Sequence, residues 1–364
     1  MVKYYCKYCN FRTIREYRLL NHNNEHKYKI ITFYNRDYNL LTSFQPMKIF
    51  YGPCIFSEIK TNKRLLINSI DNDIKNINNL IKYYPKTEVI IFNYDSDNAT
   101  SEEVSKLKNI CRLFLNFNKE IKVVNNPFNH NIITSTPFTY QKFKNSKYIN
   151  VPDFNFNLTD KIIEDKNSYP MIVSSKKQSG GIGKILIKDY NYKKFLKSKF
   201  FKNKFYAKYY ESKLNIPELS KYNISIRLLI FNNILIDYIV NYSFDWCIHV
   251  SNSIYNEKIT KQIDEYFENY FRENKNEIQN MINELFDNLG YGFYCNDYIF
   301  YNNKLILCEL GYKIILRHRM NFFKKYNLGK KVFNNHKKLK SKYKKILLSI
   351  LNEKNQFENI NKFD

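Results

Sequence analysis

The sequence predicts a chain of mixed α and β structure: a short ββα module, an α/β layer with a parallel sheet, and a larger α+β part built on hairpins. Three observations lead to this prediction. Two cysteines and two histidines are closely spaced within residues 1–27, strand-like and helix-like runs alternate over residues 47–150, and paired strand-like runs recur over residues 151–330. A linker, residues 28–46, and a basic C-terminal helix, residues 331–364, complete the predicted organisation.

The chain of 364 residues carries a formal net charge of +25. An excess of this size normally indicates a polyanionic partner such as nucleic acid. The lysines are spread along the whole chain, however, and Lys, Asn, Ile, Tyr and Phe, all with AT-rich codons, are overused together. We therefore expect codon bias to account for part of the charge, which leaves a polyanionic partner open.

Cysteine use and hydropathy lead us to expect a soluble protein of the cytoplasm, with no membrane partner. Seven cysteines is an odd count, and one pair has tight CxxC spacing, which favours a metal site over a disulfide framework. The first residues lack the apolar core of a signal peptide, and no apolar run reaches the roughly 18–20 residues that span a bilayer. The other cysteines are expected in the core: Cys54, Cys111, Cys247, Cys295 and Cys308.

The first 27 residues contain the spacing C-x2-C-x12-H-x3-H, formed by Cys6, Cys9, His22 and His26. The histidines are about one helical turn apart and would project from one face of a helix, while the cysteines would lie on a hairpin turn. So short a module needs the free energy of metal binding to fold. The segment looks like a two-Cys, two-His zinc finger.

The target of this finger stays open. If it docks like a DNA-reading finger, the base-facing positions are Arg15, Arg18 and Asn21, and arginine suits guanine while asparagine suits adenine. One finger covers only about three base pairs, however, which is too few for a specific site. The alternative is a structural or protein-binding finger.

Residues 47–150 alternate between strand-like and helix-like runs, which is typical of a parallel sheet covered by helices. The expected elements are a strand over 48–56, a helix over 69–84, a strand over 88–92, a helix over 101–117 with Ser101 as its N-cap, a strand over 121–124, and a helix over 137–147.

Three of the eight glycines lie within four residues, at Gly180, Gly181 and Gly183. A strand is expected before them, over 171–174, and another after them, over 184–188. This concentration favours a loop whose N–H groups cradle phosphate. The alternative is an ordinary hairpin turn. The pattern is neither a Walker A motif nor a Rossmann fingerprint.

A strand that begins at Ile224 is expected to continue through an Asn-Asn turn into a return strand. Arg227 is a lone cation in this apolar strand and requires an anionic partner, which a bound ligand or a core salt bridge could supply. Helical residues 258–289 follow.

The next hairpin carries one acid on each strand. We expect strands over 293–301 and 305–310, joined by three residues, a register that sets Asp297 across from Glu309 on one face. A two-residue Asn-Asn turn would instead pair Asp297 with Cys308 and turn Glu309 to the other face. Two converging carboxylates suit Mg²⁺. The alternative is a pair of edge-strand acids that face solvent.

Over residues 47–320, the order and spacing of these segments resemble the ATP-grasp family, in the branch of glutathione synthetase and the ribosomal-protein-modifying glutamate ligases. That family has a strand–Gly loop–strand unit, a strand that leads to the adenine pocket, an Ile-Arg strand and a D…E-x-N carboxylate pair. The corresponding segments here are residues 172–187, residues 205–211, Ile226-Arg227, and Asp297 with Glu309. The segment from Trp246 to Ser251 is similar to the family's W-x-x-N-x-x, with His249 for Asn.

The resemblance implies two α+β subdomains that clamp ATP, preceded by an α/β pre-ATP-grasp domain. It implies an ATP- and Mg²⁺-dependent ligase that joins a carboxylate, of a small molecule or a protein, to an amine or thiol through an acyl-phosphate. Asp297 and Glu309 would hold Mg²⁺, and Arg227 would clamp the acyl-phosphate or the carboxylate. The implied phosphate ligands are Lys176, Ser179, Gly180, Gly181, Gly183 and Lys208.

Two positions depart from the family pattern. Ser174 stands where the family has a lysine before the Gly-rich loop, so Lys176 or Lys177 would have to reach the phosphates. Gly311 stands where the family has an asparagine, so one metal ligand is missing. Three hypotheses result. The first is such a ligase, with a finger that recruits a protein or nucleic-acid target. The second is an inactive scaffold of the same fold, and the third is a protein that binds nucleic acid through the finger and its positive charge.

Overall fold

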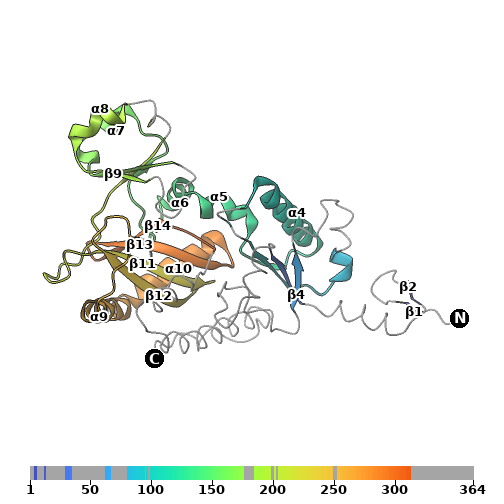
Figure 1. Cartoon of the computed structure of the whole chain (residues 1–364). Coiled ribbons are helices and arrows are strands. Elements are labelled where there is room, and N and C mark those ends of the chain that lie inside the picture. The colour runs from blue at the N-terminus through green and yellow to red at the C-terminus, as the bar shows by residue number, and fades with distance from the viewer. Residues whose placement is uncertain are drawn as a thin grey trace.

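The computed structural model of the chain describes residues 4–5, 12–13, 29–34, 62–66, 80–94, 96, 99–175, 184–197, 201, 204–248 and 252–312. These residues form mixed α and β structure, as predicted, with three four-stranded sheets and one two-stranded sheet (Figure 1). None of the helices in this described part combines the length and the apolar composition needed to cross a bilayer.

The two-stranded sheet lies at the N-terminal end. β1 (Tyr4–Tyr5) pairs antiparallel with β2 (Arg12–Thr13), with Tyr5 opposite Arg12. The metal-ligand positions predicted for the finger, Cys6, Cys9, His22 and His26, lie outside the described residues, as do Arg15, Arg18 and Asn21.

The second sheet is parallel, as predicted for the α/β layer, and its strand order is β4-β3-β5-β6. Its strands are β3 (Ile30–Tyr34), β4 (Asn62–Leu66), β5 (Val89–Asn93) and β6 (Lys122–Val124). The linker predicted over 28–46 is therefore wrong in part, because it contains the central strand β3. Ile30, Ile31 and Phe33 are fully buried, as expected of a strand covered on both faces. The strand expected over 48–56 lies outside the described residues.

One long helix covers this parallel sheet. α4 (Ser101–Phe117) buries Val104, Leu107, Ile110, Cys111 and Phe114. Its N-cap is Thr100 rather than the expected Ser101. The Thr100 hydroxyl accepts from the Glu103 amide at 3.1 Å, and the Glu103 carboxylate accepts from the Thr100 amide at 2.9 Å. This capping box requires the extended backbone that Thr100 has.

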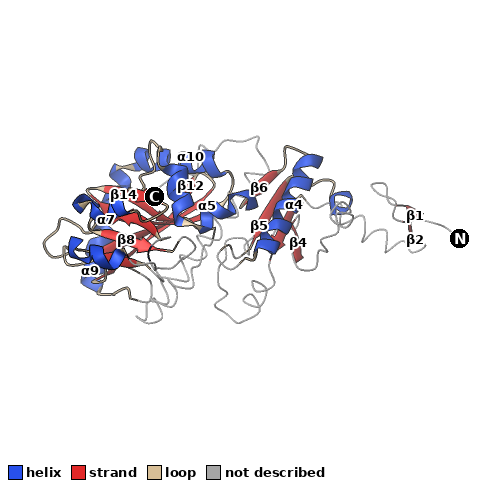
Figure 2. Ribbon diagram, turned by 90° about the horizontal axis from the view of Figure 1, so that it is seen from above, coloured by secondary structure: helices blue, strands red, loops and turns tan. Residues whose placement is uncertain are grey.

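Short helices lead away from the parallel sheet. Residues 80–83 are helical, at the end of the helix expected over 69–84. Beyond β6 follow the 3₁₀ turn η3 (Pro127–Asn129), α5 (His130–Thr134) and α6 (Thr136–Phe143). α6 begins one residue before the helix expected over 137–147 and ends four residues earlier. Seen from above, α4, β4, β5 and β6 lie apart from β8, β12 and β14 (Figure 2).

The third sheet, in the order β7-β10-β8-β9, is antiparallel and forms what we call the small lobe, residues 154–208. Its elements are β7 (Phe154–Asn155), α7 (Asp160–Glu164), η4 (Lys166–Ser168), β8 (Met171–Ser174), β9 (Ile185–Ile187), η5 (Tyr190–Tyr192), α8 (Lys193–Leu196) and β10 (Phe205–Lys208). Its core is separate from that of the rest and includes Met171, Val173 and Leu196. The pairing of β8 with β9 confirms the strands expected around the Gly-rich segment, which itself lies outside the described residues.

The fourth sheet, in the order β12-β11-β13-β14, forms the large lobe, residues 223–309, and is also antiparallel. Its elements are β11 (Asn223–Phe231), β12 (Ile234–Ser243), α9 (Glu257–Glu273), α10 (Lys275–Leu289), β13 (Phe293–Tyr301) and β14 (Lys304–Glu309). The strand, Asn-Asn turn and return strand are as predicted, and the helical stretch is two helices that meet at Asn274. Buried residues of this lobe, such as Ile226 and Leu228, and of the parallel sheet, such as Phe33 and Phe92, belong to one hydrophobic cluster.

The two lobes meet beside α6 (Figure 1). Tyr140 of α6 packs against Phe205 of the small lobe, with ring centroids 5.8 Å apart. Its hydroxyl donates to the carbonyl oxygen of Cys308 in the large lobe at 3.3 Å. α6 is thus a shared support for both lobes.

The small lobe offers a test of its surface electrostatics. Glu164 lies 2.5 Å from the Lys197 ammonium and 3.4 Å from that of Lys193, and it accepts from the Tyr190 hydroxyl at 3.0 Å. The hydrogen bonds from Lys197 and Tyr190 lower the pKa of Glu164 to about 2. A lowered folded-state pKa stabilises the fold above the unfolded-state pKa, and this stabilisation disappears as the pH falls toward about 2.

We expect Glu164→Gln to lower the melting temperature slightly near pH 6, with a difference from wild type that vanishes as the pH falls to about 2. Because the site is exposed, added salt should shrink the difference. Thermal melts across this pH range at two salt concentrations measure both effects. A difference that stays constant with pH would contradict the interpretation.

Candidate active site

The hairpin of β13 and β14 has a turn of two residues. Tyr301 pairs with Lys304, and Asn302 and Asn303 between them have positive φ angles of 48° and 58°. Asparagine tolerates this left-handed conformation, which two-residue hairpin turns require. The three-residue loop expected from the sequence is therefore wrong, and β14 begins at Lys304.

A β-bulge nevertheless brings the two acids opposite each other. Tyr298 pairs with Leu307, yet the next pair is Asp297 with Glu309, so Cys308 is an extra residue on β14. Without this bulge, the two-residue turn would place Asp297 opposite Cys308 and Glu309 on the other face. The predicted opposition of the two carboxylates is thus present, but a bulge causes it and not the loop length.

Arg227 is the neighbour of Asp297 on the other side. β11 pairs Arg227 with Asp297, and the guanidinium Nε and Nη2 donate to the two carboxylate oxygens at 2.6 and 2.7 Å. Both side chains are only 25% exposed. The nearby Asp297 carboxylate raises the pKa of Arg227 well above its ordinary value. The anionic partner that Arg227 requires is therefore a protein carboxylate, the salt-bridge alternative that the sequence left open.

Lys184 of the small lobe extends to the same group of charges. Its Nζ lies 3.9 Å from Oε2 of Glu309, and the two side chains are 18% and 29% exposed. Lys184 comes directly before β9, so this contact joins the two lobes. Sequence reasoning missed this residue, although its place directly after Gly183, at the end of the Gly-rich segment, was a usable signal. We call Lys184, Arg227, Asp297 and Glu309 the charged cluster.

Three cysteines lie beside the charged cluster. Burial raises the pKa of Cys308 to about 12, against the opposing effect of Lys184. Burial likewise raises the pKa of Cys247, and both thiols are therefore protonated near neutral pH. Cys111 is buried as predicted, whereas Cys247, Cys295 and Cys308 are only partly buried, so the expectation of core cysteines is wrong for these three. Cys54 lies outside the described residues.

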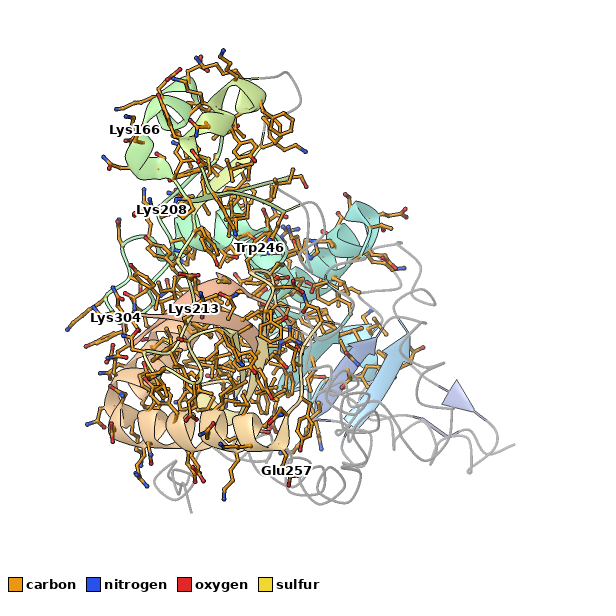
Figure 3. The ribbon with its side chains drawn as sticks, turned by 60° about the vertical axis from the view of Figure 1, so that its left-hand side comes forward. Lys166, Lys208, Lys213, Trp246, Glu257 and Lys304 are labelled. Atoms are coloured by element: carbon orange, nitrogen blue, oxygen red, sulfur yellow. The ribbon has the colours of Figure 1, made fainter. Side chains whose placement is uncertain are left out.

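Lys208 does not contact the charged cluster. Its ammonium donates to the carbonyl oxygens of Asn167 and, at 3.0 Å, of Tyr169, at and beside η4. Figure 3 shows Lys208 and Trp246 where the small lobe adjoins the large one. The Trp246 ring contacts the Tyr209 ring edge to face at 6.2 Å, which places the predicted tryptophan segment beside the strand expected to lead to the adenine pocket.

Several predicted site residues lie outside the described part of the chain. They are Lys176, Lys177, Ser179, Gly180, Gly181, Gly183, His249 and Ser251. Ser174 ends β8 and is 5% exposed. The carbonyl oxygen of Gly311, where the resemblance calls for an asparagine, accepts from the Cys295 amide at 2.8 Å.

The donor set suits a hard cation that takes only part of its coordination from the protein. Within the described residues there is no group of three or more His, Cys, Asp or Glu side chains that could hold a metal ion. Asp297 and Glu309 supply two opposed carboxylates on one face of a sheet. Mg²⁺ is often held by one or two carboxylates, with water and phosphate oxygens as its other ligands. The pair therefore fits Mg²⁺ that takes its remaining ligands from water or from a phosphate group.

Neither a protein-family model nor a curated protein matches the chain. Among solved structures, the chain is similar to N5-carboxyaminoimidazole synthetase from Staphylococcus aureus (15% identity, TM-score 0.45, covering 80% of this chain and 72% of that one). It is similar to a RimK domain protein ATP-grasp from Sphaerobacter thermophilus (8% identity, TM-score 0.43, covering 77% of this chain and 90% of that one). It is also similar to D-alanine–D-alanine ligase from Bacillus anthracis complexed with ATP (11% identity, TM-score 0.41, covering 78% of this chain and 84% of that one). With TM-scores below 0.5, none of these likenesses identifies a family.

The ion pair of Arg227 and Asp297 should contribute measurably to stability. Because each partner is mostly buried, Arg227→Met and Asp297→Asn should each destabilise the fold by about 2–4 kcal/mol, since each leaves an uncompensated charge. The free energy of unfolding of the double variant should fall by less than the sum of the two single losses, which corresponds to a coupling energy of about 1–3 kcal/mol. Urea unfolding of the four proteins measures this coupling.

A matched control is the exposed pair of Lys261 and Glu265 on α9, whose Nζ and Oε1 are 3.8 Å apart. The same cycle there should give a coupling of about 0.3–0.5 kcal/mol. A coupling between Arg227 and Asp297 no larger than this value would show that their geometry contributes nothing beyond a surface pair.

Proposed function

We propose that the chain is an ATP- and Mg²⁺-dependent ligase that joins a carboxylate to an amine or thiol through an acyl-phosphate. The observation that carries the proposal is the charged cluster. Two carboxylates and a guanidinium lie on three adjacent strands, and a lysine from a second lobe reaches the same place. Phosphoryl transfer to a carboxylate is promoted by a metal ion and by cations that offset the charge of the phosphates, and the charged cluster has side chains suited to both roles.

In this proposal, Asp297 and Glu309 hold Mg²⁺, which supplies charge neutralisation for the β- and γ-phosphates. The other phosphate ligands are Lys176, Ser179, Gly180, Gly181 and Gly183, as the sequence suggests. Lys208 would have to leave the carbonyl oxygens of Asn167 and Tyr169 to reach a phosphate, so we assign it a lesser part.

Arg227 is proposed as the residue that orients the carboxylate or the acyl-phosphate. A guanidinium has five N–H donors, and Asp297 uses two of them, which leaves three for a ligand. Asp297 fixes the guanidinium in place, and a planar group held in this way binds a carboxylate or phosphate with little further loss of freedom. The carboxylate substrate is then held beside the γ-phosphate that it attacks.

A catalytically inactive scaffold of the same fold is the second candidate. Two observations favour it. The position where the resemblance predicts a lysine is the small, buried Ser174, and Gly311 offers no side-chain oxygen to a metal. A scaffold of this kind would bind nucleotide without turnover.

A finger at the N-terminus is proposed to recruit a protein or nucleic-acid target, with Zn²⁺ on Cys6, Cys9, His22 and His26. The pairing of β1 with β2 supports it, because these strands bracket the segment that holds both cysteines. We expect purified protein to contain about one equivalent of zinc, lost in the Cys6→Ser, Cys9→Ser double variant. Metal analysis of the purified proteins measures their zinc content, and the Cys111→Ser variant, which changes a cysteine outside the finger, is the control. Equal zinc in all three proteins would remove the finger from the proposal.

Nucleotide binding is the first test of the ligase. ATP with Mg²⁺ should raise the melting temperature, since a ligand at 100 times its Kd stabilises the fold by about 2.7 kcal/mol. The effect should need Mg²⁺ and disappear in the Asp297→Asn, Glu309→Gln double variant. The control variant, Glu268→Gln with Asp287→Asn, changes two exposed acids on α9 and α10 and should retain it. If ATP with Mg²⁺ raised the melting temperature of both double variants equally, the proposed site would be wrong.

Release of ADP on addition of candidate carboxylates and amines separates the ligase from the inactive scaffold. The nucleic-acid hypothesis makes a different prediction. Binding to duplex DNA should weaken steeply as salt rises, because phosphate contacts release counterions. Stabilisation by ATP without such DNA binding would leave that hypothesis without support.

A further inference from the structure

Each carboxylate of the proposed metal site already has a basic partner. Asp297 is paired with Arg227, and Glu309 lies near Lys184. The four side chains carry two positive and two negative charges, so the charged cluster is balanced without a metal. Mg²⁺ with two positive charges would therefore disturb this balance unless a basic side chain moves or an anion arrives with the metal.

The two pairs differ in how firmly they are held. The contact of Arg227 with Asp297 is bidentate, at 2.6 and 2.7 Å, between adjacent strands of one sheet. The contact of Lys184 with Glu309 is a single approach of 3.9 Å between two lobes with separate cores. An ammonium on a flexible four-carbon stem also changes partners more easily than a planar guanidinium. Lys184 is therefore the cation that can exchange.

An ammonium displaced from Glu309 needs another anion. The Lys184 side chain is only 18% exposed, so water cannot fully solvate it in place. A phosphate group bound between the lobes would supply the missing anion.

The position of Lys184 on the β8–β9 hairpin supports this exchange. Val173 pairs with Ile185, so Ser174 and Lys184 are the next residues on the two strands beyond this pair. Lys184 therefore brings an ammonium to the end of the hairpin at which Ser174 has none.

We infer that Lys184 is an exchangeable cation. It pairs with Glu309 when the site holds no divalent cation, and it transfers to a phosphate oxygen of the nucleotide when a divalent cation binds Glu309. This inference rests on the proposed function. It predicts that metal and nucleotide assist each other's binding, and by linkage the assistance is equal in both directions.

The test is Lys184→Gln with two binding measurements. Without nucleotide, Mn²⁺ affinity, measured by the electron paramagnetic resonance of free Mn²⁺, should rise about two- to fivefold, because Glu309 loses a competing cation. With Mg²⁺ at saturation, ATP affinity, measured by calorimetry, should fall about tenfold or more, because a charge-assisted hydrogen bond to phosphate is lost. A residue with a purely structural role would not move the two affinities in opposite directions.

Two control variants sharpen this test. Lys188→Gln changes an exposed lysine directly after β9 and should leave both affinities unchanged. Lys184→Arg keeps the charge and should retain most of the ATP affinity. Opposite shifts in Lys184→Gln, absent from Lys188→Gln, support the inference. If Lys184→Gln leaves the affinities for Mn²⁺ and ATP unchanged, or lowers both, the inference about Lys184 is overturned and the proposed function is not. A wild-type protein that binds neither Mn²⁺ nor ATP overturns the proposed function as well.

Discussion

The bidentate ion pair between Arg227 and Asp297 is the interaction on which the centre of the molecule depends. Both groups lie on neighbouring strands of one sheet and are mostly withdrawn from water. A charge in such a place is tolerated only with a partner of opposite sign. The pair fixes the register of β11 against β13 at this point and holds the guanidinium and the carboxylate in a defined orientation. Any ligand that reaches the charged cluster would meet groups that are already positioned.

The bulge at Cys308 extends this arrangement to a third strand. The Asn302–Asn303 turn alone would send the side chain of Glu309 to the opposite face of the sheet. One extra residue on β14 restores the pairing of Glu309 with Asp297. Bulges are frequent next to functional sites because they re-aim a side chain in this way. Here, the bulge decides whether two acids converge, and it supplies the second carboxylate of the proposed metal site.

The division into two lobes determines how the charged cluster can change. The large lobe shares its core with the parallel sheet, whereas the small lobe has a core of its own. Lys184 is carried by the small lobe and contacts Glu309 across the boundary. A change in the spacing of the lobes would therefore alter this contact first and leave the pair of Arg227 and Asp297 intact. The firmly held and the exchangeable charges thus belong to different parts of the fold.

Local patterns determined most of the elements in the described residues: the parallel α/β layer, the β11–β12 and β13–β14 hairpins, and the requirement of Arg227 for an anion. The sequence missed β3, which has no amphipathic alternation because it is buried on both faces. It could not select the partner of Arg227, the bulge at Cys308 or the contact of Lys184 with Glu309. The bulge depends on the register of β13 against β14. The two ion pairs join residues 70 and 125 positions apart along the chain, which come together only when the strands pair and the two lobes meet.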